Sequence, residues 1–477
     1  MTVPQIVAAC AVAWLAVVVP LVPDASSVTV SGIDVVMLAV AVALIAAVPL
    51  VRRTARDALP GVGMTVAGAG FIAWAALGIL FSVSPVGSLM TLGRYGSYLL
   101  LVAAVAVVAV DPRLRRTVMG VISAAATVTA LHGLWQYSHP TVRIGMQEIA
   151  SDVSARVFAS FSNPNFYAEY LVMTIAVTAA LAMTSRRALR ILWITMCSIQ
   201  VAALLLTYTR GSWLALVVGL VVAGSMIDPR IAVLPVMLIG VMAPLIPGVV
   251  QRLSSMFTLS GSAGFRIKLW RVALAAIASR PVFGYGLGRF YEAFLDVIDR
   301  TPGLAFGYAY YGAHNSYLQI AAETGVVGGV AFAALVATAC RVGLYYNPRL
   351  KDRSERWENA LLTAGMIAFA INALTSNAFQ HPQGAVFFFV LAGLQAGLGS
   401  RVWDEPPAVP SAPKRQLPSV VQGSAAVRAV LRAQELAARA WRGSLARRLL
   451  VQSPATDGKA LWRSVLKRAV DGPWDRG

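Results

Sequence analysis

Long apolar runs recur along most of the chain, and short polar segments separate them. Runs of about 18 or more apolar residues are typical of membrane-spanning helices. The pattern predicts twelve spans, centred near residues 13, 42, 72, 102, 126, 174, 199, 220, 239, 333, 367 and 392. The first run, Pro4 to Pro23, has no basic segment before it and no small-residue cleavage site, so we interpret it as a retained helix rather than a signal peptide.

The composition points the same way. Of 477 residues, 58% are hydrophobic and 13% are charged, whereas soluble domains carry about 25% charged residues. The net charge of +19 would suggest a nucleic-acid or acidic partner, but a distribution of basic residues set by membrane topology explains most of it. The expected fold class is all-α: a polytopic membrane protein with about 12 transmembrane helices and a small helical extracytoplasmic cap.

Basic residues concentrate in every second connection between the predicted spans. Five short connections hold fifteen of them: Arg52, Arg53 and Arg56; Arg113, Arg115 and Arg116; Arg186, Arg187 and Arg190; Arg230; and Arg341, Arg349, Lys351, Arg353 and Arg356. By the positive-inside rule these connections face the cytoplasm. Both termini are then cytoplasmic, which requires an even number of spans and agrees with twelve.

The same pattern predicts two domains. Residues 1–403 form the transmembrane domain, including a connection at 248–322 that is too long for a simple loop and contains helical stretches such as Arg266 to Ser279. Residues 404–477 form a basic cytoplasmic tail that begins with a linker rich in Pro, Ala and Ser. Its segment 424–450 fits either an interfacial helix on the anionic inner leaflet or a loosely ordered tail.

Polar residues gather at the ends of spans on the predicted outer side. Asn163 and Pro164 suit the N-cap and the first helical position of the sixth span. They form either a simple helix cap or, together with Asn165, a helix end that binds phosphate. Arg210 breaks the positive-inside pattern in a predicted tight turn at residues 207–213, where the alternatives are snorkelling to headgroups and a functional pocket.

Seven further basic residues occupy the long connection, where the charge rule expects few. They are Arg252, Arg266, Lys268, Arg271, Arg280, Arg289 and Arg300. Contact with lipid headgroups is one explanation, and an anionic substrate is the other, because the planar guanidinium matches phosphate oxygens.

One histidine in this connection is a candidate for proton transfer. His314 precedes Asn315, Ser316 and Tyr317, beside the predicted membrane interface. Histidine exchanges protons near neutral pH, so we interpret His314 as catalytic, with His381 as a second candidate.

Other site chemistries are disfavoured. The three cysteines fall in apolar runs, the four histidines lack metal-ligand spacing, and the outer connections contain no D-x-D pair, so the sequence predicts no metal site. The glycines at 284, 286 and 288 include a G-x-G pattern but follow no strand, so we interpret them as tight turns rather than a dinucleotide site.

The ordered set of motifs resembles the O-antigen ligase and polymerase family over about residues 60–400. The set comprises Asn163-Pro164-Asn165, Thr209-Arg210-Gly211, His314-Asn315-Ser316-Tyr317 and Glu323-Thr324-Gly325. The resemblance implies a metal-independent, inverting glycosyltransferase of the membrane-embedded C type, in the bacterial cytoplasmic (inner) membrane. Its donor would be a glycan on undecaprenyl pyrophosphate and its acceptor a lipid or surface glycan, with no cofactor and no nucleic acid.

The resemblance also implies roles for single residues. In the ligase branch two outer arginines bind the pyrophosphate and a histidine near the end of the long connection assists the acceptor. Arg210, Arg266 and His314 match these positions, while Arg271, one turn from Arg266, competes for the second arginine position. The residues expected to bind substrate around them are Asn163, Asn165, Arg271, Arg289, Asn315, Tyr317 and Glu323.

Three alternatives stay open at the level of sequence. A polymerase that joins O-antigen or other surface polysaccharide repeats would use the same donor and differ in its acceptor. A transporter of polyprenyl-linked glycans would also have many spans, although internal repeats and charges at span centres, both frequent in transporters, are not evident. A scaffolding membrane protein would use the long connection only to bind a partner.

Overall fold

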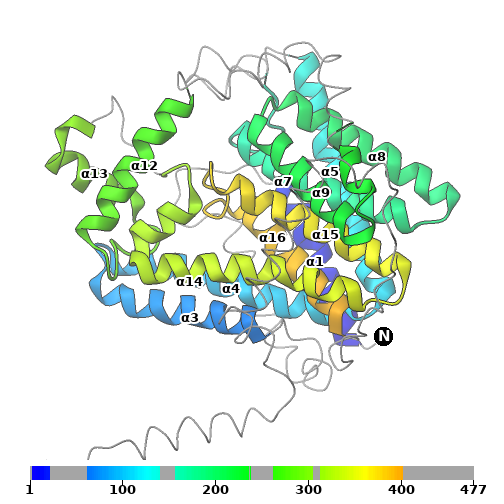
Figure 1. Ribbon diagram of the computed structural model, residues 1–477, viewed down its shortest axis with the longest axis horizontal. Coiled ribbons are helices and arrows are strands. Elements are labelled where there is room, and N and C mark those ends of the chain that lie inside the picture. The colour runs from blue at the N-terminus through cyan, green and yellow to red at the C-terminus, as the bar shows by residue number, and fades with distance from the viewer. Residues whose placement is uncertain are drawn as a thin grey trace, which may run out of the picture. The chain divides into compact units, whose positions relative to one another are not determined.

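The computed structural model describes residues 3–21, 62–139, 156–235, 237, 262–304 and 312–400 (Figure 1). Every regular element in these residues is helical. The chain divides into two compact units, Met1–Pro407 and Ala408–Gly477, and the second unit lies entirely outside the described residues. The predicted tail at 404–477 and its segment 424–450 therefore stay predictions.

Twelve α-helices are described, and Figure 1 labels them. They are α1 (Val3–Leu21), α3 (Val62–Gly78), α4 (Pro85–Ala109), α5 (Pro112–Ser138), α7 (Pro164–Thr184), α8 (Arg187–Leu206), α9 (Arg210–Ile227), α12 (Ser262–Ser279), α13 (Phe290–Arg300), α14 (Ser316–Tyr346), α15 (Arg353–Asn372) and α16 (Pro382–Gly399). Short 3₁₀ turns occur at Ile79–Phe81, Ile231–Val233, Pro302–Leu304 and Asn347–Arg349.

Eight of the described helices are long and apolar enough to cross a membrane. They coincide with the spans expected near residues 72, 102, 126, 174, 199, 220, 333 and 392. Helices α1 and α15 occupy the positions expected near 13 and 367, but α1 has a shorter apolar stretch and α15 begins with charged turns. The spans expected near 42 and 239 lie outside the described residues, so the all-helical fold is confirmed and the count of twelve stays a prediction.

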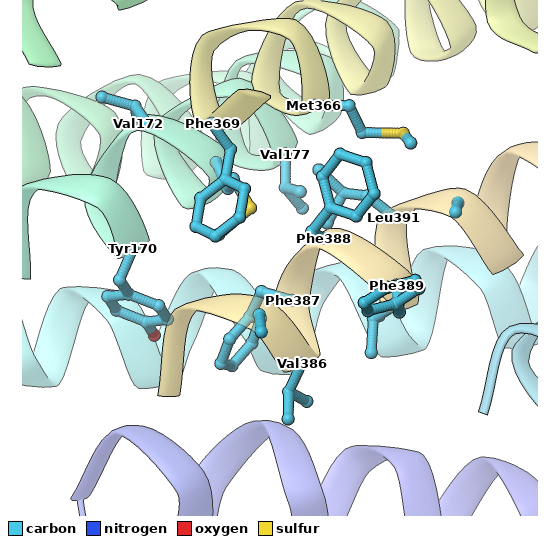
Figure 2. Close-up of a cluster of buried hydrophobic side chains, with 14 of the residues drawn as sticks. Tyr170, Val172, Val177, Met366, Phe369, Val386, Phe387, Phe388, Phe389 and Leu391 are labelled. Atoms are coloured by element: carbon cyan, nitrogen blue, oxygen red, sulfur yellow. The ribbon is translucent and has the colours of Figure 1, made fainter. Parts of the chain in front are cut away.

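The core is built around α7, α15 and α16. Every residue of α16 is buried, and its aromatic run packs against α7 and α15 (Figure 2). The rings of Phe379 and Phe388 lie 5.0 Å apart, and Tyr170 on α7 lies 4.8 Å from Phe387. Between membrane helices such close packing supplies most of the stabilisation, because lipid is as apolar as the side chains themselves.

The helices alternate in direction, so the N-termini of α7, α9, α14 and α16 lie at one end of the bundle, which we call the site end. The ring of Phe166 on α7 lies 3.4 Å from that of His381 before α16. The Thr209 hydroxyl before α9 donates to Oδ1 of Asn165 on α7 at 3.3 Å. The Ser316 amide of α14 donates to the Ala373 carbonyl just after α15 at 2.8 Å.

Two of the predicted basic connections meet at the opposite end. Arg115, only 2% exposed, is ion-paired with buried Glu358 and lies 3.5 Å from Glu355, and its guanidinium also donates to the Ala109 carbonyl. Arg116 donates to Ser354 at 3.1 Å. These contacts join the basic connection before α5 to the one before α15, whereas the expected placement of all five connections on one side of a membrane stays a prediction.

A break in α14 anchors the glycine turns of residues 284–288. Gly325 has φ +74°, and a side chain there would overlap the Val282 carbonyl. The gap in the helix admits the backbone of this turn segment: the Tyr285 amide donates to Ala322 and the Gly286 amide to Glu323. The predicted tight turns are confirmed, since Gly284, Gly286 and Gly288 all have positive φ.

Helices α12 and α13 form a second apolar cluster, separate from the main core. Leu269, Val272 and Ala276 of α12 pack there with Phe290 and Phe294 of α13. The helix expected at 266–279 is present within α12, whereas the proposed position of this unit as an extracytoplasmic cap stays a prediction.

We predict that Arg115→Ala destabilises the protein by about 3 kcal/mol, because it leaves Glu358 charged, buried and unpaired. Chemical denaturation in detergent micelles measures the change. Arg113→Ala, at an exposed position two residues earlier, is the control and should shift stability by no more than about 0.5 kcal/mol. Equal effects of the two variants would contradict a structural role for the buried pair.

Candidate functional site

The site end combines several helix N-termini. The N-terminus of an α-helix carries a partial positive charge and unsatisfied N–H groups, and both favour a bound anion. Helices α7, α9, α14 and α16 all begin here, and the contacts of Asn165 with Thr209, Phe166 with His381 and Ser316 with Ala373 keep those starts together. The arrangement favours negative charge before any side-chain cation is considered.

Arg156 ties two of these helix starts together. Its Nε donates to the Thr207 carbonyl at 2.7 Å, and one Nη donates to Oδ1 of Asn165 at 2.8 Å and to the Thr209 hydroxyl at 2.9 Å. Thr209 is the N-cap of α9, so Arg156 fixes the position from which Arg210 starts. The sequence interpretation missed Arg156, although it is an arginine shortly before the predicted outer end of the sixth span and breaks the charge rule as Arg210 does.

Arg210 is the first residue of α9 and is half-buried. The tight turn predicted before it is confirmed, because Tyr208 has φ +49°, a conformation uncommon for residues other than glycine. Gly211 faces the end of α15: a Cβ there would lie 3.7 Å from Oδ1 of Asn372 and 3.6 Å from the Thr375 hydroxyl. The start of α9 therefore lies against the α15–α16 connection.

Arg266, near the start of α12, lies within electrostatic reach of Arg210 and Glu169. Burial and the positive charge of Arg210 lower the pKa of Arg266, while the Glu169 carboxylate on α7 acts in the opposite direction. Glu169 is 2% exposed. Arg271, the competing candidate one turn later, is exposed, whereas Arg266 is half-buried and feels the charge of Arg210.

His314 lies beside these arginines in the segment that precedes α14. Burial, the Arg266 charge and His381 together lower the pKa of His314 to about 4. Its backbone has φ +49°, its ring lies edge-on to Phe265 at 6.0 Å, and its carbonyl accepts from Trp270 at 3.4 Å. The imidazole is therefore neutral near pH 7 and able to accept a proton.

His381, the second histidine candidate, is close enough to His314 to influence its charge. It is the N-cap residue of α16, and its carbonyl accepts from the amides of Gly384 and Ala385. Its ring contacts Phe166 of α7. The two histidines, 67 positions apart in the chain, thus share one end of the bundle.

The asparagines of the predicted motifs cap helices. Asn163 caps α7 through a bond from the Asn165 amide at 2.8 Å, with Pro164 at the first helical position, as predicted from the sequence. Oδ1 of Asn165 accepts from Arg156 and Thr209. Asn315 caps α14, where its Oδ1 accepts from the amides of Tyr317 and Leu318, both at 3.0 Å.

Two predicted substrate-binding residues have well-defined partners within the protein. The Tyr317 hydroxyl donates to the Ala370 carbonyl at 3.0 Å, and its ring packs against the main core. Glu323 accepts from the Gly288 amide at 2.7 Å and from the side chain of Gln319 at 2.9 Å. Gln319 in turn accepts from the Ala313 amide, so Glu323 supports the segment that carries His314.

Arg289 lies with the glycine turns rather than with Arg210. It is ion-paired with Glu292 at 3.0 Å and packs against Gly87 at the start of α4. Its charge also acts on Glu323. Among the described residues, no group of three His, Cys, Asp or Glu side chains is placed to hold a metal ion.

Comparison with known protein families finds a match within the chain. Residues 195–333 match the sequence model of the O-antigen ligase family. The match runs from α8 through α9, α12 and α13 into α14, and it contains Arg210, Arg266 and His314. No curated protein matches the chain in sequence.

We predict that the pKa of His314 rises from about 4 towards its usual value of about 6.5 in Arg266→Gln, because a positive charge that opposes protonation is removed. Nuclear magnetic resonance of labelled histidine in detergent micelles follows the titration. Arg271→Gln, the exposed neighbour on the same helix, should leave the pKa unchanged. An unchanged pKa in Arg266→Gln would show that Arg266 and His314 are not in electrostatic contact.

Proposed function

We propose that this chain, whose residues 195–333 match the sequence model of the O-antigen ligase family, transfers a glycan from undecaprenyl pyrophosphate to an acceptor hydroxyl. The observation that carries this proposal is the group of Arg210, Arg266 and His314 at the site end, next to four helix N-termini. Two cations suit a pyrophosphate, and a neutral imidazole beside them suits an attacking hydroxyl.

The two arginines would bind the donor and stabilise the leaving group. A polyprenyl pyrophosphate departs with its negative charge on the phosphate oxygens, so departure needs positive charge more than a strong acid. Arg210 extends from a helix start that itself favours anions. Arg266 is half-buried beside a like charge, a position that a bound pyrophosphate would stabilise.

His314 would orient the acceptor hydroxyl and remove its proton. Because its pKa is lowered to about 4, the imidazole is in the proton-accepting form at neutral pH. Attack from the face of the sugar opposite to the pyrophosphate forms the new C–O bond while the C–O bond to phosphate breaks, which inverts the anomeric configuration. The hydroxyl proton passes to His314 and the electron pair of the broken bond leaves with the pyrophosphate.

Arg156 would act as a positioning residue for Arg210. It holds Thr209 against Asn165 and so fixes the first turn of α9 against that of α7. Misplacing a binding group by about 1 Å can reduce a rate 100-fold, so the geometry of this start matters to catalysis.

The charge pattern supports a location of the site on the outer face. Arg115, Arg116 and Glu358 lie at the end of the bundle opposite to Arg210. By the positive-inside rule that end faces the cytoplasm, and the site end faces outwards. A lipid-linked donor in the outer leaflet could then reach the arginines from the side.

We predict that His314→Ala and Arg210→Ala each lower kcat by about 100-fold or more, through loss of the proton acceptor and of leaving-group stabilisation respectively. The assay incubates purified protein with a defined undecaprenyl pyrophosphate glycan and candidate acceptors, and identifies products by mass spectrometry. Arg271→Ala is the control and should stay close to wild type. Wild-type rates in both site variants would overturn the proposal, and longer lipid-linked glycans as the only product would assign the chain to the polymerases.

We also predict that Arg156→Lys lowers kcat about tenfold or more, because lysine keeps the charge but lacks the planar fork that binds three acceptors. The same transfer assay separates kcat from the KM for donor. Arg187→Lys, an exposed arginine at the start of α8, is the matched control. A rise in KM with unchanged kcat would contradict positioning and indicate donor binding by Arg156 itself.

A further inference from the structure

The connection between α15 and α16 extends from the Arg210 side of the site to the His314 side. At its start, Asn372 accepts a hydrogen bond from the Ser212 hydroxyl at 3.1 Å, two residues after Arg210. Further along, Asn377 packs against Gly312, two residues before His314, so closely that any side chain at Gly312 would overlap the Asn377 amide. Asn372 therefore contacts the segment that carries Arg210, and Asn377 contacts the segment that carries His314.

Hydrogen bonds from α14 hold this connection in place. The Ser316 amide donates to the Ala373 carbonyl at 2.8 Å, and the Ser316 hydroxyl donates to Oε1 of Gln380 at 2.8 Å. The Phe379 amide donates back to the Ser316 hydroxyl at 3.2 Å. A fixed backbone means that Asn372 and Asn377 present their amides in a defined geometry.

Each asparagine has a buried polar atom with no hydrogen-bond partner among the described residues. These atoms are Nδ2 of Asn372 and Oδ1 of Asn377, in side chains that are 4% and 8% exposed. A buried polar group without a partner is unfavourable by about 1–3 kcal/mol, so such groups are uncommon in folded proteins. One of these atoms lies at the last residue of α15 and the other in the α15–α16 connection, next to the segments that carry Arg210 and His314. In this place they suit a ligand that supplies both a hydrogen-bond acceptor and a hydrogen-bond donor.

We propose that Asn372 and Asn377 form a subsite for the hydroxyl groups of the first sugar of the donor, the sugar joined directly to pyrophosphate. The inference rests on the proposed transfer reaction. In an inverting displacement the anomeric carbon lies between the leaving group and the proton acceptor, which places this sugar between Arg210 and His314. The α15–α16 connection extends over that interval.

The chemistry of the subsite determines which sugars it accepts. A hydroxyl can accept from Nδ2 of Asn372, and another can donate to Oδ1 of Asn377. A site that hydrogen-bonds a substrate hydroxyl discriminates against analogues that lack it, because its own buried polar groups are then left unpaired. The two asparagines would thus recognise the first sugar independently of the pyrophosphate.

The test compares two probes on the full-length protein in detergent micelles. One probe is bare undecaprenyl pyrophosphate, and the other is undecaprenyl pyrophosphate carrying a single hexose, with monodeoxy hexoses as analogues. Native mass spectrometry gives the Kd of each. The ratio of the two dissociation constants reports the contribution of the sugar alone.

In wild type the lipid that carries the hexose should have a lower Kd than the bare lipid, and we call the ratio of the two Kd values the gain from the sugar. Asn372→Ala and Asn377→Ala should each reduce that gain by roughly five- to tenfold, the loss of about one hydrogen bond, and leave the Kd of bare undecaprenyl pyrophosphate within about twofold of wild type. Each asparagine is expected to bind one hydroxyl of the hexose. The hexose that lacks this hydroxyl should bind wild type as weakly as the complete hexose binds the alanine variant of that asparagine. Arg210→Ala should instead weaken both probes.

Asn359→Ala is the matched control. Asn359 lies on the same helix, about 20 Å from Asn372, and it is also buried with an unpartnered Oδ1. Its replacement should leave the ratio unchanged, which separates recognition of the sugar from the general effect of removing a buried asparagine. Asn377 lies in the connection rather than in a helix, so Asn377→Ala still tests the subsite if Asn372→Ala does not fold.

The possible failures are distinguishable. If wild type binds bare undecaprenyl pyrophosphate but the gain from the sugar is the same in both variants, the subsite is wrong and the proposed transfer is unaffected. If wild type binds neither probe, the proposed transfer reaction fails and the subsite with it. An equal loss of the gain in Asn359→Ala would also overturn the subsite.

Discussion

Two guanidinium groups held near each other at the end of an apolar bundle impose the main physical constraint on this molecule. Arg210 and Arg266 repel one another, and burial disfavours the charged form of Arg266. Glu169, buried on α7, opposes this effect on Arg266 in its ionised form. The helix N-termini around them add to the positive charge, so the fold must hold these cations in place against their mutual repulsion.

The rest of the structure supplies that restraint. Arg156 joins the starts of α7 and α9, and Glu323 supports the His314 segment through Gln319. Below them, the fully buried α16 packs against its neighbours and gives these helix starts a rigid base. The family match contains Arg210, Arg266 and His314, whereas several of their supports come from segments outside it, on both sides in the chain. The proposed chemistry therefore depends on contacts between the matched segment and the remainder of the bundle.

Much of the helical fold follows from local sequence patterns. A run of apolar residues long enough to span a bilayer must satisfy its backbone hydrogen bonds internally, so it forms a helix wherever it lies in the chain. The cap at Asn163 and Pro164 is equally local, since both residues act on the first turn of their own helix. Hydropathy alone does not explain the charged first turns of α15. They pack into the bundle because Glu358 is buried in an ion pair with Arg115 on α5, a contact between helices that are far apart in the chain.

The sequence by itself identified Arg210 and His314 as candidates, because an arginine on the side where the charge rule expects few, and a histidine in the arginine-rich connection, are visible without coordinates. The resemblance to the O-antigen ligase family then singled out Arg266 among the seven basic residues of that connection. Only the tertiary structure showed that Arg266 is half-buried while Arg271 is exposed. Only it placed Glu169 near Arg266 and Arg156 next to the start of α9, and gave Tyr317 a partner in the core. Only the structure, too, brought Asn372 and Asn377 to the two sides of the site. These outcomes depend on contacts between helices far apart in the chain, and hydropathy and capping patterns describe each helix separately. Side-chain burial and electrostatic contact are properties of the packed bundle, so the composition of the site was decided there.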